Sequence, residues 1–128
     1  MRVLLDTHAL LWFLLDDARV GRKARPIMTD PSNSLLVSPA SYWEIAIKIG
    51  IGKYTLGEDL AEFMEREIAE NEMTVLAITA RHAGLVARLP FHHRDPFDRL
   101  LIAQAMVEQI PVLSSDAMFD RYSVVRVW

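Results

Sequence analysis

Short runs of apolar residues, typical of strands buried on both faces, alternate along this chain with segments of helical periodicity. The runs lie at residues 2–5, 34–37, 73–78, 111–113 and 123–127. The pattern between them predicts helices over residues 8–15, about 20–28, from Pro39 to Gly50 or Gly52, 58–71, 79–89, and from Asp95–Pro96 onwards. Strands that alternate with helices form parallel sheets with right-handed crossovers. The sequence therefore predicts an α/β fold around one parallel sheet.

The composition is that of one globular domain spanning residues 1–128. The chain is 52% apolar and 24% charged, and no linker or low-complexity segment divides it. It has no cysteine, which excludes disulfides and thiolate metal sites. The apolar runs are too short to span a bilayer, and Asp6 and His8 interrupt the first run, so it does not resemble a signal peptide. We expect a cytoplasmic protein without a membrane partner.

Four carboxylates stand where such a sheet would bring them together: Asp6, Glu44, Asp98 and Asp116. Asp6 and Asp116 each directly follow a predicted strand, and parallel sheets bind ligands beyond the carboxyl ends of their strands. Glu44 and Asp98 lie on apolar helices. Acids gathered beside apolar surface repel one another and resist desolvation, and a hard divalent cation, Mg²⁺ or Mn²⁺, relieves both costs. The sequence therefore predicts a metal-dependent site that cleaves phosphoryl compounds.

Two of these acids also have structural interpretations. Asp6 could cap the helix that follows it, although Thr7 is available for the same role, and we expect Thr7 to be the cap. Glu44 could form a surface ion pair with Lys48, four residues later on the same helix. A charge within so apolar a segment is costly to bury unless it is paired or coordinated, which favours a functional role for Glu44.

The other two acids have structural interpretations as well. Asp98 falls near the third helical position, where an acid favours the helix dipole. Asp95 competes with it as a ligand, but the following Pro96 fits Asp95 better as the N-cap. Asp116 could be a turn residue, and Asp120 is an alternative that lies farther from the strand end.

Other site chemistries lack their motifs here. The four histidines, His8, His82, His92 and His93, do not have zinc-binding spacing, and no glycine-rich phosphate loop or Gly-x-Ser-x-Gly elbow is present. Asp6 is not followed by the second aspartate of an aspartyl-phosphate motif. The net charge of −3 neither supports nor excludes a nucleic-acid substrate, because acids and bases nearly balance once the four candidate ligands are set aside.

The chain resembles the PIN-domain ribonucleases and, more narrowly, the VapC-like toxins of type II toxin–antitoxin pairs. The resemblance covers essentially the whole chain. Four segments in the right order carry it: Leu4-Leu5-Asp6-Thr7-His8-Ala9-Leu10-Leu11-Trp12, Ser38-Pro39-Ala40-Ser41-Tyr42-Trp43-Glu44-Ile45-Ala46-Ile47-Lys48, His93-Arg94-Asp95-Pro96-Phe97-Asp98-Arg99-Leu100-Leu101-Ile102-Ala103-Gln104-Ala105 and Leu113-Ser114-Ser115-Asp116.

This resemblance implies a PIN-like three-layer fold, with a central five-stranded parallel sheet of order 3-2-1-4-5 flanked by helices. It implies that an acid cluster binds Mg²⁺ or Mn²⁺, and by motif position the ligands match Asp6, Glu44, Asp98 and Asp116. It also implies endonucleolytic cleavage of RNA, a co-encoded antitoxin and a homodimer. Ser114 stands where the family more often has threonine; its hydroxyl could orient a metal-bound water or serve the turn.

We expect in-line attack of a metal-activated water on an RNA phosphodiester. Arg99, Arg94 and Lys48 are candidate phosphate contacts, although each could be only a surface charge. The apolar stripe around Trp12, together with the 58–71 helix, could form a groove for an antitoxin helix or could be ordinary core. Two other functions remain open: a PIN-like module that binds RNA or a partner without cleavage, and a metal-dependent phosphatase or DNA nuclease.

Overall fold

The computed structural model describes all residues, 1–128, and confirms the predicted α/β architecture. Five parallel strands form one sheet in the order β3-β2-β1-β4-β5. This is the order 3-2-1-4-5 that the resemblance implied. The strands are β1 (Arg2–Leu5), β2 (Ser34–Val37), β3 (Thr74–Val75), β4 (Val112–Leu113) and β5 (Arg126–Val127).

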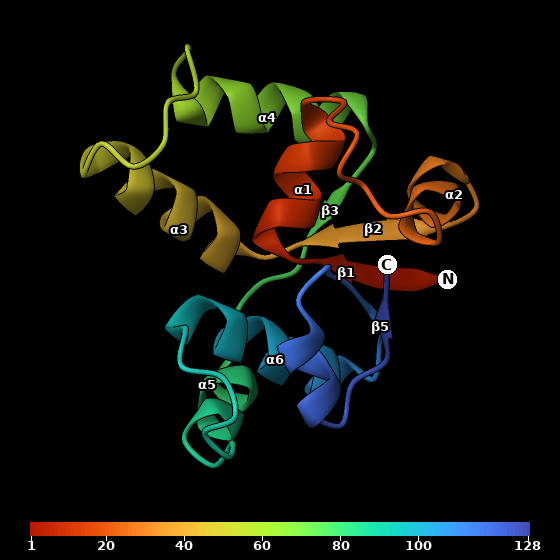
Figure 1. Cartoon of the computed structure of the whole chain (residues 1–128), viewed down its shortest axis with the longest axis vertical. Coiled ribbons are helices and arrows are strands. Elements are labelled where there is room, and N and C mark those ends of the chain that lie inside the picture. The colour runs from red at the N-terminus through yellow and green to blue at the C-terminus, as the bar shows by residue number, and fades with distance from the viewer.

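Helices cover both faces of the sheet, which gives the three layers expected for this fold (Figure 1). On one face lie α1 (Thr7–Leu14), α2 (Ala24–Thr29), α3 (Pro39–Gly50) and α4 (Leu60–Glu70). On the other lie α5 (Ala80–Val86) and α6 (Pro96–Glu108). A short 3-10 helix, η1 (Ala117–Arg121), follows β4. No helix combines the length and the apolar character needed to span a bilayer.

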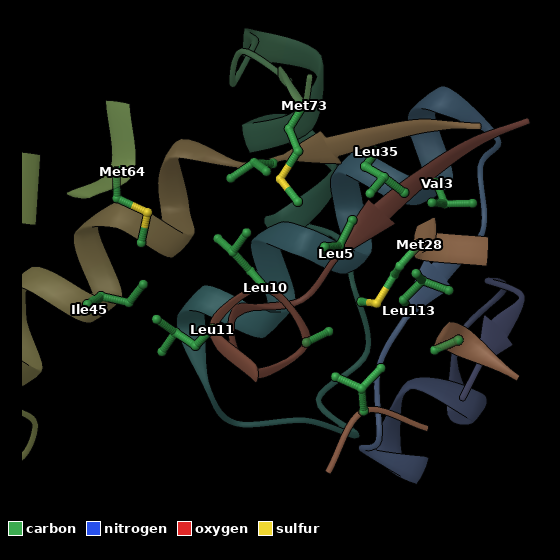
Figure 2. Packing of buried hydrophobic residues seen from close by; sticks show 14 of the residues in the cluster. Val3, Leu5, Leu10, Leu11, Met28, Leu35, Ile45, Met64, Met73 and Leu113 are labelled. Atoms are coloured by element: carbon green, nitrogen blue, oxygen red, sulfur yellow. The ribbon is translucent and has the colours of Figure 1, made fainter. Parts of the chain in front are cut away.

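The sheet divides the core into two apolar clusters. Val3 and Leu5 of β1 point into the first cluster with α1–α4, whereas Leu4 between them points into the second with α5 and α6. Figure 2 shows part of the first cluster, in which Leu5 from the sheet lies near Leu10 from α1. Because successive side chains of a strand point to opposite faces, a strand buried on both faces is apolar at every position. That is why the buried residues of β1, β2 and β4 appear in the sequence as apolar runs.

Three strands are shorter than predicted, β4 by one residue and β3 and β5 by more, because only part of each apolar run pairs. The run at 73–78 forms a strand only at Thr74 and Val75, which pair with the end of β2. The next carbonyl, of Leu76, accepts a hydrogen bond from the Gln104 side chain on α6 at 3.1 Å, so the backbone leaves the sheet there. The run at 123–127 likewise pairs only at its last two residues, Arg126 and Val127.

The second helix was predicted to begin near residue 20, but it begins at Ala24. Residues before it form a turn that passes against the carboxyl terminus of the chain. A Cβ added at Gly21 would lie 2.6 Å from the carbonyl carbon of Trp128, so only glycine fits this close approach. The contact between distant residues therefore decides where α2 begins.

The cap of α1 is Asp6, so the prediction that Thr7 caps this helix is wrong. Oδ1 of Asp6 accepts a hydrogen bond from the backbone N–H of Ala9 at 2.7 Å. The Thr7 hydroxyl instead donates to Oγ of Ser41 at 3.0 Å and ties α1 to α3. Asp95 caps α6 as predicted, accepting from the N–H groups of Phe97 and Asp98.

Candidate functional site

The paired ends of β1 and β4 bring Asp6 close to the segment that carries Asp116. Leu5 and Leu113 are in register, and the N–H of Asp6 donates to the carbonyl of Leu113 at 3.1 Å. The next residue, Ser114, is fully buried. Its Oγ accepts from the N–H of Asp116 at 3.0 Å. Its hydroxyl also hydrogen-bonds the Asp6 carboxylate, which partly offsets the rise that burial causes in the pKa of Asp6. Ser114 thus links the two acids at the carboxyl edge of the sheet.

The first turn of α6 and the loop before it add two further groups. Nε2 of His93 lies 2.7 Å from Oδ2 of Asp116 and 3.1 Å from Oδ2 of Asp98. One potential ligand atom from each of these three residues lies within 4.8 Å of the other two. The structure therefore brings two of the four predicted ligands, Asp98 and Asp116, within the span of a single ion.

Glu44 enters the site from α3. Its Oε2 accepts from Nζ of Lys48 at 2.9 Å, so the predicted pair forms, but the Glu44 side chain is only 5% exposed and the Lys48 side chain is 39% exposed. The second carboxylate oxygen, Oε1, is buried and has no hydrogen-bond partner. A buried carboxylate oxygen without a partner is costly, so the ion pair alone does not account for Glu44.

The acids act strongly on one another. The pKa of Asp98 is raised to about 8, first by burial and then by the charges of Asp95, Asp6, Glu44 and Asp116, in decreasing order. Burial also raises the pKa of Asp6. Four carboxylates therefore lie close enough to Asp98 to oppose its ionisation, and a simple helix-dipole acid would show the opposite shift.

Comparison with known proteins identifies the family. The family model of the PIN domain matches residues 3–125. The chain belongs to the PIN domain family. No curated protein matched it.

Solved structures agree with this PIN fold along nearly the whole chain. VapBC2 from Rickettsia felis, bound to a DNA fragment from its promoter, has 12% identity and a TM-score of 0.70, with 99% of this chain and 98% of that chain covered. VapBC-1 from nontypeable Haemophilus influenzae has 14% identity and a TM-score of 0.67, covering 99% and 97%. VapBC-5 from Mycobacterium tuberculosis, of a family of toxin–antitoxin systems, has 17% identity and a TM-score of 0.59, covering 98% of each chain. At these identities the similarity concerns the fold.

The donor set of this PIN domain fits a hard divalent cation. The groups that face one another are mainly carboxylate oxygens, which Mg²⁺ and Mn²⁺ prefer. The unpartnered Oε1 of Glu44 and the raised pKa of Asp98 are both features that a cation would relieve. Asp120, the alternative to Asp116, is not part of the cluster, because its carboxylate is paired with Arg126 at 2.9 Å.

The prediction that Arg99 contacts phosphate is wrong. Its side chain is buried at 5% exposure, and its guanidinium donates to the carbonyls of Val86, Leu89 and Pro90 at 2.9–3.2 Å. These carbonyls belong to the end of α5 and the chain after it, so Arg99 satisfies a helix C-terminus. Its guanidinium also stacks over the ring of Phe91, 4.0 Å from the centroid. Arg94, in contrast, is exposed beside the site.

Sequence reasoning missed His93. Histidine spacing along the chain, the usual signal of a zinc site, says nothing about a residue whose partners are aspartates on two other segments. The only signal was its place in a polar loop, two residues before the N-cap Asp95. The N–H of Asp95 donates to Nδ1 of His93 at 3.2 Å. The loop therefore holds the ring through the nitrogen that does not face the aspartates.

The predicted groove was to be formed by α4 and the stripe around Trp12, and only the part played by α4 is confirmed. An apolar cavity of about 630 Å³ does involve α4, but it lies between α4 and α3 and its lining does not include Trp12. Trp12 instead packs against Trp128 with ring centroids 5.7 Å apart and lines a separate cavity between α1 and α3. The interpretation of Trp12 as part of a groove with the 58–71 helix is therefore wrong.

The raised pKa of Asp98 predicts how the stability of this PIN domain depends on pH in EDTA. The folded protein keeps a proton on Asp98 up to about pH 8, whereas the unfolded chain releases it near the ordinary value of 3.8. The free energy of unfolding therefore falls as the pH rises from near 3.8 to about 8. Asp98→Asn cannot ionise, so we expect it to exceed the wild type at pH 8 by more than about 1 kcal/mol.

Thermal melts of the two proteins across this pH range, followed by circular dichroism, test this prediction. Asp120→Asn serves as the matched control, because it removes an exposed carboxylate outside the cluster. Parallel curves for the wild type and Asp98→Asn would contradict it. In millimolar Mn²⁺ the wild type should gain stability that Asp98→Asn lacks.

Proposed function

We propose that this PIN domain is a metal-dependent endoribonuclease that acts as the toxin of a toxin–antitoxin pair. The observation that carries the proposal is the closeness of Asp6, Glu44 and Asp116 to Asp98. Their charges help to raise the pKa of Asp98 to about 8. A binding module without chemistry gains nothing from acids that destabilise one another. Membership of the PIN family and the fold of the VapBC structures support the same assignment.

Asp6, Glu44, Asp98 and Asp116 would hold Mg²⁺ or Mn²⁺. When bound, such an ion stabilises the charge that develops on phosphodiester oxygens and lowers the pKa of a water nucleophile. The chain itself positions the carboxylates. Ser114 holds Asp6 and Asp116 through its hydroxyl, and Lys48 holds one oxygen of Glu44 while leaving the other free.

A cavity beside the acids supports a single-stranded RNA substrate. It has a volume of about 400 Å³, and its lining includes aromatic and basic side chains: His8, Trp12, Arg19, Lys48, Lys53 and Tyr54. Lys48 belongs both to this lining and to the ion pair with Glu44, so the cavity adjoins the acid cluster. Proteins bind splayed single-stranded bases by stacking them on aromatic rings and by neutralising the backbone with cations.

The experiment that tests the proposal is cleavage of a substrate panel. Single-stranded RNA, double-stranded RNA, single-stranded DNA and a phosphomonoester are each incubated with the protein in Mn²⁺ and in EDTA. We expect internal cleavage of single-stranded RNA in Mn²⁺ alone. Cleavage of DNA or hydrolysis of the phosphomonoester in preference to RNA would support a DNA nuclease or a phosphatase instead. Binding of RNA without cleavage under all conditions would support a non-catalytic module.

The cavity between α3 and α4 supports the toxin role, because it suits an apolar helix of an antitoxin. Nine of its eleven lining residues are hydrophobic, and it is formed by exposed faces of α3 and α4 that include Trp43, Ala61 and Ala69. Amphipathic helices bind such grooves through apolar anchors. VapBC-5 from Mycobacterium tuberculosis, which has the same fold, is a member of a family of toxin–antitoxin systems, and this favours an antitoxin over other partners.

We expect Ala69→Arg to weaken the complex with the co-encoded antitoxin by at least about tenfold, because an arginine in the groove clashes with an apolar anchor and loses hydration. Glu70→Arg, the neighbouring position outside this groove, is the matched control. Isothermal titration calorimetry measures both affinities. Equal affinities for the two variants would show that the antitoxin binds elsewhere. The homodimer implied by the resemblance is tested by sedimentation of the same purified proteins.

A further inference from the structure

The ring of His93 engages the oxygens that a metal ion would need. Nε2 lies 2.7 Å from Oδ2 of Asp116 and 3.1 Å from Oδ2 of Asp98. The other oxygen of Asp116 already accepts the N–H of Met118 at 2.9 Å. Both carboxylate oxygens of Asp116 are thus committed to donors of this chain.

The hydrogen bond to the other ring nitrogen decides which nitrogen carries the proton. Nδ1 of His93 faces the backbone N–H of Asp95 at 3.2 Å, so Nδ1 accepts and the proton of the neutral ring is on Nε2. Histidines that bind metals show the reverse arrangement, in which the free ring N–H donates to a carbonyl or carboxylate. His93 is therefore arranged as a hydrogen-bond donor to Asp116, with Oδ2 of Asp98 3.1 Å from the same nitrogen. A metal–Nε2 bond would first require loss of the bond from Asp95.

The ring is held firmly in this orientation. The backbone N–H of His93 donates to the hydroxyl of Tyr122 at 2.8 Å, and that hydroxyl donates to the carbonyl of Pro90 at 2.7 Å. The imidazole packs edge-on against Phe119, with ring centroids 5.9 Å apart. The side chain is 13% exposed. These contacts come from the loop before α6 and from η1, so the ring is oriented by the fold and not only by the acids.

We propose that His93 is a latch, a positioning residue whose Nε2–H binds Oδ2 of Asp116 beside Oδ2 of Asp98 and competes with the divalent cation for these oxygens. Binding of the ion then requires the hydrogen bond from His93 to Asp116 to be exchanged for a metal–oxygen bond, which lowers the affinity for the ion. The inference rests on the metal site of the proposed function. It differs from a ligand role for His93 in the sign of its effect on metal affinity.

Calorimetric titration of Mn²⁺ into wild type, His93→Ala, His93→Gln and His92→Ala tests the latch. His93→Ala removes the competing donor, so we expect Mn²⁺ to bind roughly threefold to tenfold more tightly, in line with the net loss of one ordinary hydrogen bond. His93→Gln keeps an N–H donor and should stay near the wild type. His92 is the matched control, because its ring is exposed and packs edge-to-face against Tyr122, with centroids 5.3 Å apart.

Weaker binding or unchanged binding by His93→Ala would overturn the latch and leave the metal site intact. Absence of Mn²⁺ binding by the wild type and all three variants would overturn both the latch and the proposed metal site. A second measurement uses nitrogen-15 NMR of the imidazole with Mg²⁺. We expect the proton to stay on Nε2 as Mg²⁺ is added, whereas its transfer to Nδ1 would show direct ligation and overturn the latch.

Discussion

Asp98→Asn is expected to reduce the rate of RNA cleavage in Mn²⁺ by at least about 100-fold. Asp98 is the carboxylate on which the other acids converge, since Asp95, Asp6, Glu44 and Asp116 all raise its pKa. Asparagine has nearly the same shape and can keep its place in the first turn of α6, so the protein should fold. It cannot supply the negative charge that the cation requires.

The rate is measured with a labelled single-stranded RNA at saturating Mn²⁺, and circular dichroism verifies the fold of each variant. Asp120→Asn is the matched control and should retain the wild-type rate, because Asp120 is paired with Arg126 outside the cluster. If Asp98→Asn cleaved RNA as fast as the control, Asp98 would have no part in the reaction. Asp6→Asn provides an independent test of the same site from the end of β1.

Arg99→Met is expected to destabilise the protein by about 3 kcal/mol, which is the largest stability effect that we predict. The guanidinium donates to three carbonyls at the end of α5 and after it, and to a fourth, that of His93, at 3.5 Å. Methionine fills similar space but leaves these buried acceptors without donors. Arg99→Lys keeps the charge, but a single ammonium cannot reach the same set of carbonyls, so it should also be destabilised.

Chemical denaturation of the wild type and the variants measures this loss. Arg94→Ala is the control, because Arg94 is exposed and should change the stability by less than about 0.5 kcal/mol. A stability of Arg99→Met equal to that of the wild type would contradict the structural role assigned to Arg99.

Much of the fold and half of the site geometry could be predicted from local pattern. Asp6 and Asp116 follow apolar runs, and the ends of parallel strands meet at one edge, so their proximity depends only on strand order. Asp95 was predicted as a cap from Asp-Pro alone. The N-cap of α1 was predicted wrongly because Asp6 and Thr7 both suit that role locally, and only the hydrogen bond from Thr7 to Ser41 on α3 separates them.

The sequence by itself determined the class of the fold and the positions of the acids along it. Apolar periodicity and capping residues act over a few positions, so they can be recognised in the sequence without knowledge of the packing. Tertiary structure alone decided that Arg99 faces the end of α5, that His93 meets two aspartates, and that α4 forms its groove with α3 rather than with Trp12. Those contacts join segments far apart in the chain, and the direction of a long side chain depends on how whole helices pack.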